Sequence, residues 1–238
     1  TALNAVGVSH NDEVITSPFT FISTANTILM QGAVPVFADV EEDTFNIDPN
    51  EITQKITGKT KAILTVDLYG HLCDYDKING IAGKNNLVVV EDACQSVNAE
   101  RKQKKAGSFA GIAAFSFYAT KNITCGEGGM LATGSKSYAE NARLFRQHGR
   151  YDMEQYEYAS LGYNYRMTDI SAAMLLEQLK KLDFITNKRI ENAEYLSKSL
   201  RKIKGIRVPV VKEGYKHVFH QYTIKVEDDF KLKRDELA

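Results

Sequence analysis

The chain has little of several features that would assign a protein to a class at once. Its 30 lysines and arginines balance 30 aspartates and glutamates, so the formal net charge is zero. This balance supplies neither the basic surface that attracts nucleic acid nor an acidic interaction tail. No apolar run approaches the length of a membrane span, and no signal peptide opens the chain. We therefore expect a cytoplasmic protein with no nucleic-acid or membrane partner.

Cysteine is also scarce. Cys73, Cys94 and Cys125 lie far apart and form no CxxC pair, which fits a reducing compartment better than a disulfide framework. His217 and His220 are close together, but no further ligands stand near them in the sequence. A metal site needs three or four ligands, so none is predicted.

Short apolar runs alternate with helical stretches up to about residue 133. Several runs are continuously apolar, which favours a largely parallel sheet covered on both faces. The 238 residues suffice for a full core. The expected strands are 14–16, 34–40, 62–66, 87–90, 113–117 and 130–133, and the expected helices are 23–30, 49–56 and 74–84.

After residue 137 the pattern changes. Apolar residues recur at helical spacing over 170–182 and again over 190–203, which predicts two long amphipathic helices. The stretch 205–209 ends the second helix, and 217–226 is predicted to be a strand.

Lys121 is the most informative residue. It follows the apolar, aromatic-rich run 113–117 and precedes the glycine-rich turn Gly126–Gly129. A lysine amine can form a Schiff base with an aldehyde cofactor, above all pyridoxal 5'-phosphate (PLP). The turn itself lacks the GxxxxGK[ST] pattern of a nucleotide-binding loop, and a structurally required turn is its better interpretation.

Asp92 ends another buried-looking strand. In open α/β sheets, ligands bind at the carboxyl ends of the strands. Taken alone, an acid there is more often a helix cap or turn residue. Together with Lys121 it predicts a PLP site, because the pyridine nitrogen of this cofactor needs a carboxylate partner.

Two polar neighbours extend this hypothesis. Gln95 follows Asp92 by three residues and would share its face if a helix began there, within reach of the ring hydroxyl of PLP; a surface role is equally compatible with the sequence. Ser116 lies in the strand before Lys121, where its hydroxyl can meet the cofactor phosphate. An isolated strand serine is usually structural, so this assignment depends on its neighbours.

The chain resembles the DegT/DnrJ/EryC1/StrS aminotransferases along nearly its whole length. One motif alone would be weak evidence, but here several occur in the family's order. The matching segments are Asp12–Ile15 with Pro18–Asn26, Gly32–Val40, Glu91–Gln95, Ser116–Asn122 with Gly126–Gly129, and Leu161–Asp169.

The resemblance implies an α/β fold of the aspartate aminotransferase type I class. Its large domain is a three-layer α/β/α PLP-transferase domain with a mostly parallel mixed sheet. We expect this PLP-binding domain over 1–168, truncated at its N-terminus. Interdomain helices would follow over 169–204. Residues 205–238 would begin a small C-terminal α+β domain, also truncated.

The resemblance also implies site roles. Lys121 would bind the PLP aldehyde, Asp92 the pyridine nitrogen, Gln95 the ring oxygen and Ser116 a phosphate oxygen. Phe21 would lie against the cofactor ring, because an aromatic face stacks well there.

The active site would need a homodimer. Asn164 is expected to reach the phosphate of the neighbouring subunit's cofactor. Asp67 and Tyr118 stand where the family commonly has histidine, and we expect both to influence substrate choice.

The implied activity is a PLP-dependent transamination in polysaccharide biosynthesis. An amino group, with glutamate as the expected donor, would pass to a keto group of a nucleotide-linked sugar. One alternative is a nucleotide-sugar 3-dehydratase of the same family, in which histidine replaces the lysine; Lys121 argues against it. The other is a catalytically inactive regulatory or oligomerising homologue, against which stands the intact set of Lys121, Asp92 and Gln95.

Overall fold

A six-stranded sheet forms the centre of the molecule. The computed structural model describes residues 1–151 and 156–237. The strand order is β2-β1-β3-β4-β7-β8; all pairs are parallel except β7 with β8. The strands are β1 (Glu13–Thr16), β2 (Val34–Phe37), β3 (Thr60–Val66), β4 (Val88–Asp92), β7 (Ile112–Ser116) and β8 (Gly129–Ala132). The predicted mixed, mostly parallel sheet is confirmed.

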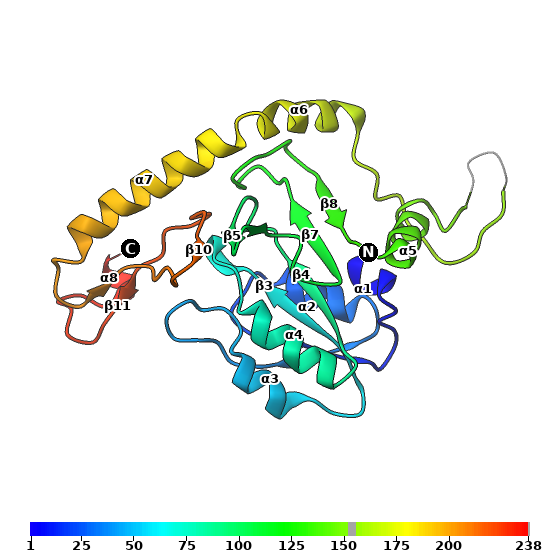
Figure 1. Ribbon diagram of the computed structural model, residues 1–238, viewed down its shortest axis with the longest axis horizontal. Helices are drawn as coiled ribbons and strands as arrows, with labels where there is room; N and C mark the ends of the chain where they lie inside the picture. Colours follow the sequence, from blue (N-terminus) through cyan, green and yellow to red (C-terminus); the bar gives the residue numbers. More distant parts are fainter. Residues whose placement is uncertain (152–155, 238) are drawn as a thin grey trace.

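Helices cover both faces of this sheet (Figure 1). Because side chains alternate along a strand, Val14 packs into one cluster and its neighbour Ile15 into the other. The first cluster includes α1 (Ala2–Ala5), α2 (Ser23–Leu29) and α5 (Lys136–Arg146), and the second includes α3 (Pro49–Lys55) and α4 (Tyr75–Lys84). The three-layer α/β/α architecture follows directly from this two-sided burial.

Side-chain caps define where several helices begin. Asp48 accepts from the backbone N–H of Asn50 at α3, and Asp74 accepts from that of Lys77 at α4. Ser135 accepts from the N–H of Tyr138 and starts α5. This helix was not among the sequence predictions, although its cap was visible in the sequence.

Two long helices arch over the carboxyl edge of the sheet, as Figure 1 shows in yellow and orange. They are α6 (Asp169–Leu179) and α7 (Leu182–Leu200), which confirms the predicted pair. Leu175 of α6 packs with Phe117 and Ile123 from the loop after β7. In the part of the chain that the structure describes, no helix has the length and apolar character needed to cross a membrane.

The remaining elements are short. The predicted strand over 217–226 is wrong: β10 ends at Lys216 and β11 begins at Lys225. Between them, the backbone N–H groups of Val218 and Gln221 donate to the carbonyls of Gly70 and Tyr69, which do not lie in a strand. These elements are η1 (Leu68–Gly70), β5 (Glu100–Arg101), β6 (Lys104–Lys105), β9 (Ile206–Arg207), β10 (Tyr215–Lys216), β11 (Lys225–Val226) and α8 (Arg234–Leu237).

Gly70 allows the segment after β10 to approach the sheet. Its carbonyl accepts from the N–H of Val218 at 3.0 Å, and its φ is +102°. A Cβ at this position would lie 2.8 Å from Cγ2 of Val218 and 3.1 Å from the carbonyl oxygen of Gln95. The absence of a side chain here therefore brings together two parts of the chain that are far apart in sequence.

We expect Gly70→Ala to lower the free energy of unfolding by at least about 2 kcal/mol, because left-handed strain adds to the steric conflict. Gly126→Ala is the matched control, since Gly126 also has a positive φ but nothing within 4 Å of its Cβ position. Its cost should be about 1 kcal/mol. Urea unfolding measures both, and equal losses would contradict the steric argument.

Candidate functional site

The carboxyl ends of three parallel strands meet at one edge of the sheet. Val66 of β3 pairs with Asp92 of β4, and Asp92 pairs with Ala114 of β7. A cavity of about 580 Å³ opens at this edge. Of the residues predicted from the sequence, those that line it are Phe21, Asp92, Gln95, Ser116 and Lys121.

Asp92 is the acid of this cavity. Its Oδ1 accepts from the N–H of Cys94 at 3.0 Å. Burial raises the pKa of the Asp92 carboxyl, and the hydrogen bonds from Cys94 and the charge of Lys121 oppose this rise only in part. Because the desolvated carboxylate is costly, a cation placed beside it would be strongly favoured.

Gln95 and Ser116 keep donors available. The Oε1 of Gln95 accepts from the N–H of Tyr69 at 2.8 Å, which leaves its amide N–H groups for a ligand. Ser116 Oγ accepts from the N–H of Tyr118 at 3.3 Å, so its hydroxyl proton is also available. No helix begins at Asp92, since residues 93–99 form turns. The turns nevertheless bring Gln95 to the same cavity as Asp92.

Lys121 lies in the loop between β7 and β8. Its N–H donates to the carbonyl of Tyr118, and the next residue, Asn122, donates from Nδ2 to the carbonyl of Val218. The backbone is thus fixed on both sides of the lysine. The Lys121 ammonium has no hydrogen bond or ion pair to any residue in 1–151 or 156–237. A half-buried, unpartnered amine in a cavity is available for chemistry.

The other two predicted residues differ. Phe21 precedes α2 and exposes 70% of its surface while it lines the cavity, so its aromatic face is free. Asn164 does not line this cavity. It is exposed and forms a single β-bridge with Gln147. A role for Asn164 in a neighbouring subunit stays a prediction.

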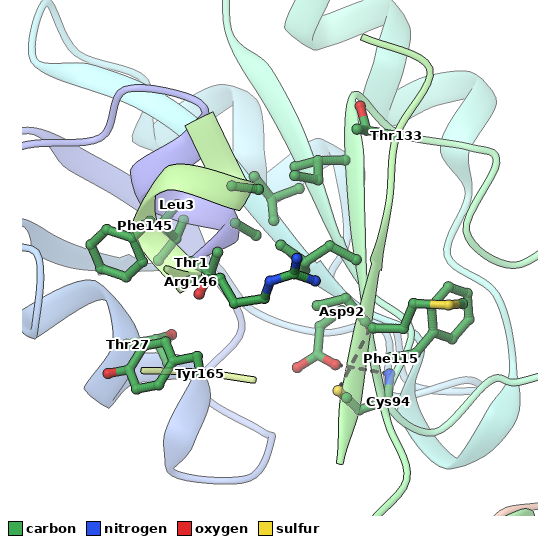
Figure 2. A pocket seen from close by; sticks show the side chains of 18 of the residues that line it. Thr1, Leu3, Thr27, Asp92, Cys94, Phe115, Thr133, Phe145, Arg146 and Tyr165 are labelled. Carbon is green, nitrogen blue, oxygen red and sulfur yellow. Dashed lines mark hydrogen bonds between the residues drawn. The ribbon is translucent and has the colours of Figure 1, made fainter. Parts of the chain in front are cut away.

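A second cavity of about 810 Å³ adjoins the first. Asp92 and Cys94 line both cavities. Figure 2 shows the Asp92 carboxyl at one wall of the larger cavity and Arg146 extending into it from α5. Asp92 therefore stands at the boundary between the two cavities.

A layer of buried acids supports this edge from below. Asp67 is fully buried and accepts hydrogen bonds from the Tyr75 and Ser96 hydroxyls at 2.9 Å each. Glu91, also fully buried, accepts from the N–H groups of Gly107 and Phe109. Burial raises the pKa of both carboxyls, and the charge of Asp67 raises that of Glu91 further. Glu91 is therefore the protonated member of the pair at neutral pH.

This position corrects one expectation. Asp67 cannot influence substrate choice by contact, because it has no exposed surface and does not line the cavity. It instead fixes the backbone around Cys73, whose N–H it accepts at 3.0 Å. Tyr118 does line the cavity, so its influence on substrate choice stays a prediction.

Tyr69 and His220 also line the cavity, and sequence reasoning did not select them. Tyr69 has a φ of +58°, a conformation that is uncommon for bulky residues and that no motif announced. His220 is remote from Lys121 in the sequence, and only folding brings it near.

The residues present fit PLP. Asp92 offers a desolvated carboxylate for a protonated pyridine nitrogen, and Gln95 and Ser116 offer free donors for the ring oxygen and the phosphate. The exposed ring of Phe21 provides a stacking face, and Lys121 provides the amine.

The sequence of this chain is similar to those of known aminotransferases. The profile of the DegT/DnrJ/EryC1/StrS aminotransferase family matches residues 1–238. The spore coat polysaccharide biosynthesis protein SpsC of Bacillus subtilis is 43% identical, covering 95% of this chain and 61% of its own length. A GDP-perosamine synthase of Caulobacter vibrioides is 40% identical, covering 99% of this chain and 64% of its own.

A solved structure has a similar fold. The crystal structure of DesV from S. venezuelae superimposes with a TM-score of 0.93 at 34% identity, covering 99% of this chain and 62% of that one. The chain spans less than two thirds of the length of each of these relatives.

We expect the contribution of Glu91 to the free energy of unfolding to fall as the pH rises from about 4.5, the ordinary pKa of a glutamate, to about 9, its raised pKa in the folded protein. The reason is that the folded state holds the Glu91 proton more tightly than the unfolded chain does. Glu91→Gln removes this titration but keeps an oxygen for the Gly107 N–H. The slope of its free energy of unfolding against pH should therefore be more positive than that of the wild type, by up to about 1.4 kcal/mol per pH unit.

Urea unfolding between pH 5 and pH 9 measures this difference. The control is Glu140→Gln on the exposed side of α5, which should leave the wild-type slope unchanged. Parallel profiles for the wild type and Glu91→Gln would show that Glu91 is not protonated in the folded protein.

Proposed function

Because the chain belongs to the DegT/DnrJ/EryC1/StrS aminotransferase family, we propose that it acts as a PLP-dependent aminotransferase. It transfers an amino group, with glutamate as donor, to a keto group of a nucleotide-linked sugar. One observation carries the proposal: the unpartnered amine of Lys121 lines the same cavity as the desolvated carboxyl of Asp92.

Each residue of the cavity has a distinct task. When bound, PLP supplies an aldehyde that reacts with amines and a ring that withdraws electrons from the substrate carbon. Asp92 keeps a proton on the pyridine nitrogen, and Gln95 donates to the ring oxygen. Ser116 donates to the phosphate. The Nζ of Lys121, once free, takes the proton from Cα of the donor and returns it on the cofactor side.

The sugar acceptor is supported by the relatives rather than by any one contact. One relative is a GDP-perosamine synthase, and another is a spore coat polysaccharide biosynthesis protein. The two adjoining cavities of about 580 and 810 Å³ offer room for a substrate larger than an amino acid. These observations favour a nucleotide-linked sugar and a place in polysaccharide biosynthesis.

The proposal includes a homodimer with shared active sites. Large apolar side chains are exposed beside the cavities, among them Phe21 at 70%, Ile22 at 63% and Met30 at 69%. Leu161 and Ile170, at 75% and 77%, flank the segment that holds Asn164. Exposed apolar surface of this kind marks an interface. A second copy placed there would bring its Asn164 to the cofactor phosphate.

The Lys121 proposal has a spectroscopic test. The purified protein with PLP should show an absorption band that glutamate bleaches, and Lys121→Ala should lose the bleaching and at least about 1,000-fold in transamination rate. Lys104→Ala, an exposed lysine of β6, is the control and should behave like the wild type. A wild-type band that no amino donor changes would refute the transaminase.

The shared site has a complementation test. Asn164→Ala should weaken PLP binding about tenfold or more, because a hydrogen bond to a charged phosphate is lost. Mixed after dissociation and assayed at a PLP concentration that leaves Asn164→Ala homodimers largely without cofactor, Lys121→Ala and Asn164→Ala subunits should regain about a quarter of wild-type activity, since half of the dimers would contain one intact site. Activity no greater than the sum of the two separate variants would mean that each subunit builds its own site.

A further inference from the structure

The segment 217–221 is held in an unusual backbone conformation where it meets the cavity. Phe219 has a φ of +45°, a left-handed conformation that is an outlier for a bulky residue. Its ring stacks on that of His217, with centroids 4.0 Å apart and planes 4° from parallel. The N–H of Phe219 donates to Nδ1 of His217 at 3.0 Å. Strain of this kind persists only where surrounding contacts enforce it.

The surrounding contacts tie this segment to the rest of the site. Arg189 of α7 donates to the carbonyl oxygens of Phe219 and His220 at 3.1 and 3.4 Å. Asn122 donates to the carbonyl of Val218 at 3.2 Å. Since Asn122 directly follows Lys121, the loop of the reactive lysine and the strained segment form one connected unit.

This arrangement brings His220 into the cavity that Lys121 lines. The Nδ1 of His220 is buried and has no hydrogen-bond partner among the residues that the structure describes. Burial, together with the charges of Lys121 and Arg189, lowers the pKa of His220 to about 4. The imidazole is therefore neutral at pH 7, and one of its ring nitrogens carries a lone pair.

The residues around His220 indicate which group can donate a hydrogen bond to its ring. The charged and titratable residues that share its cavity or act on its ring are Tyr69, Asp92, Cys94, Tyr118, Lys121 and Arg189. Arg189 is already engaged by two carbonyls, whereas the Lys121 ammonium has no partner among the described residues. His220, with an unpartnered ring nitrogen, and Lys121, with an unpartnered amine, thus line one cavity. The positive charge of Lys121 favours the tautomer that turns the lone pair toward it.

We propose that His220 is a positioning residue for Lys121: its neutral imidazole accepts a hydrogen bond from the lysine ammonium whenever the amine is not bound to the cofactor. The inference rests on the proposed role of Lys121 and adds a second position for its amine. A lysine that must leave the cofactor and return benefits from a defined resting partner. A neutral acceptor suits this task, because a carboxylate would hold the ammonium too firmly.

The test measures how fast the Lys121 amine reacts with trinitrobenzenesulfonate in the cofactor-free protein, by mass spectrometry of its peptide. His220→Phe keeps the ring but removes the acceptor, so the ammonium should lose its proton more readily. Labelling at pH 7 should become about 3- to 10-fold faster. The gain should disappear above about pH 11, where lysine amines are already neutral. His220→Asn, which restores an acceptor near Nδ1, should return the rate to near the wild-type value.

Two comparisons separate positioning from loosening. Tyr222 directly follows the segment 217–221 and does not line the cavity. Tyr222→Phe removes its hydrogen bond to Ser197 and should leave the labelling rate unchanged. A gain for His220→Phe that persists at high pH, or one shared by Tyr222→Phe, would show greater access to Lys121 and would overturn the proposal. An unchanged rate in His220→Phe would overturn it too.

The readout is independent of transamination. If the wild type binds PLP and responds to glutamate but His220→Phe labels like the wild type, only this inference fails. If no amino donor acts on the wild type while the labelling pattern holds, the proposed function fails and the contact between His220 and Lys121 stands.

Discussion

The parallel register of β3, β4 and β7 is the constraint on which the rest of the site depends. Evenly spaced hydrogen bonds hold Val66 beside Asp92 and Asp92 beside Ala114, so the chain leaves the sheet three times at one edge. Each exit becomes a loop, and these loops carry Tyr69, Gln95 and Lys121. A shift of one residue in β4 would turn the Asp92 side chain to the opposite face of the sheet. The positions of the cavity residues therefore depend first on the pairing of the strand backbones.

The buried acids beneath this edge hold the segments that follow the strands in place through hydrogen bonds. Asp67 accepts from Cys73 and Ser96, in the loops that follow β3 and β4, and from Tyr75 at the start of α4. One residue thus bonds to the segments after both strands, and a separate hydrogen bond from the Tyr69 N–H holds the amide of Gln95. Burying two carboxyls is costly, but a shared proton removes one of the charges. Burial also raises the pKa of Asp92, but this carboxyl lines the cavity, where a cation would stabilise its charged form.

The cavity combines a rigid wall with strained loops. Tyr69 and Phe219 both adopt positive φ values and lie on facing segments joined by Gln221 N–H to the Tyr69 carbonyl at 3.4 Å. Gly70 allows this contact because it has no side chain. Strain near a ligand site keeps side chains in positions that local preference alone would not choose. The proposed transamination would give these positions a role, since it requires one lysine to act in two places.

The sequence by itself determined the layers of the fold and the acid–lysine pair. Continuous apolar strands require burial on both faces, and a lysine between a strand and a glycine turn, paired with an acid at a strand end, indicates a PLP site. Both features depend on short stretches of sequence and can be recognised there. Helix α5 was missed although Ser135 caps it, and the stretch after β10 was mistaken for a strand because its apolar pattern resembles one. The burial of Asp67 and the position of His220 in the cavity that Lys121 lines could be seen only in the tertiary structure. Those outcomes depend on contacts between residues far apart in the chain, and no local pattern encodes them.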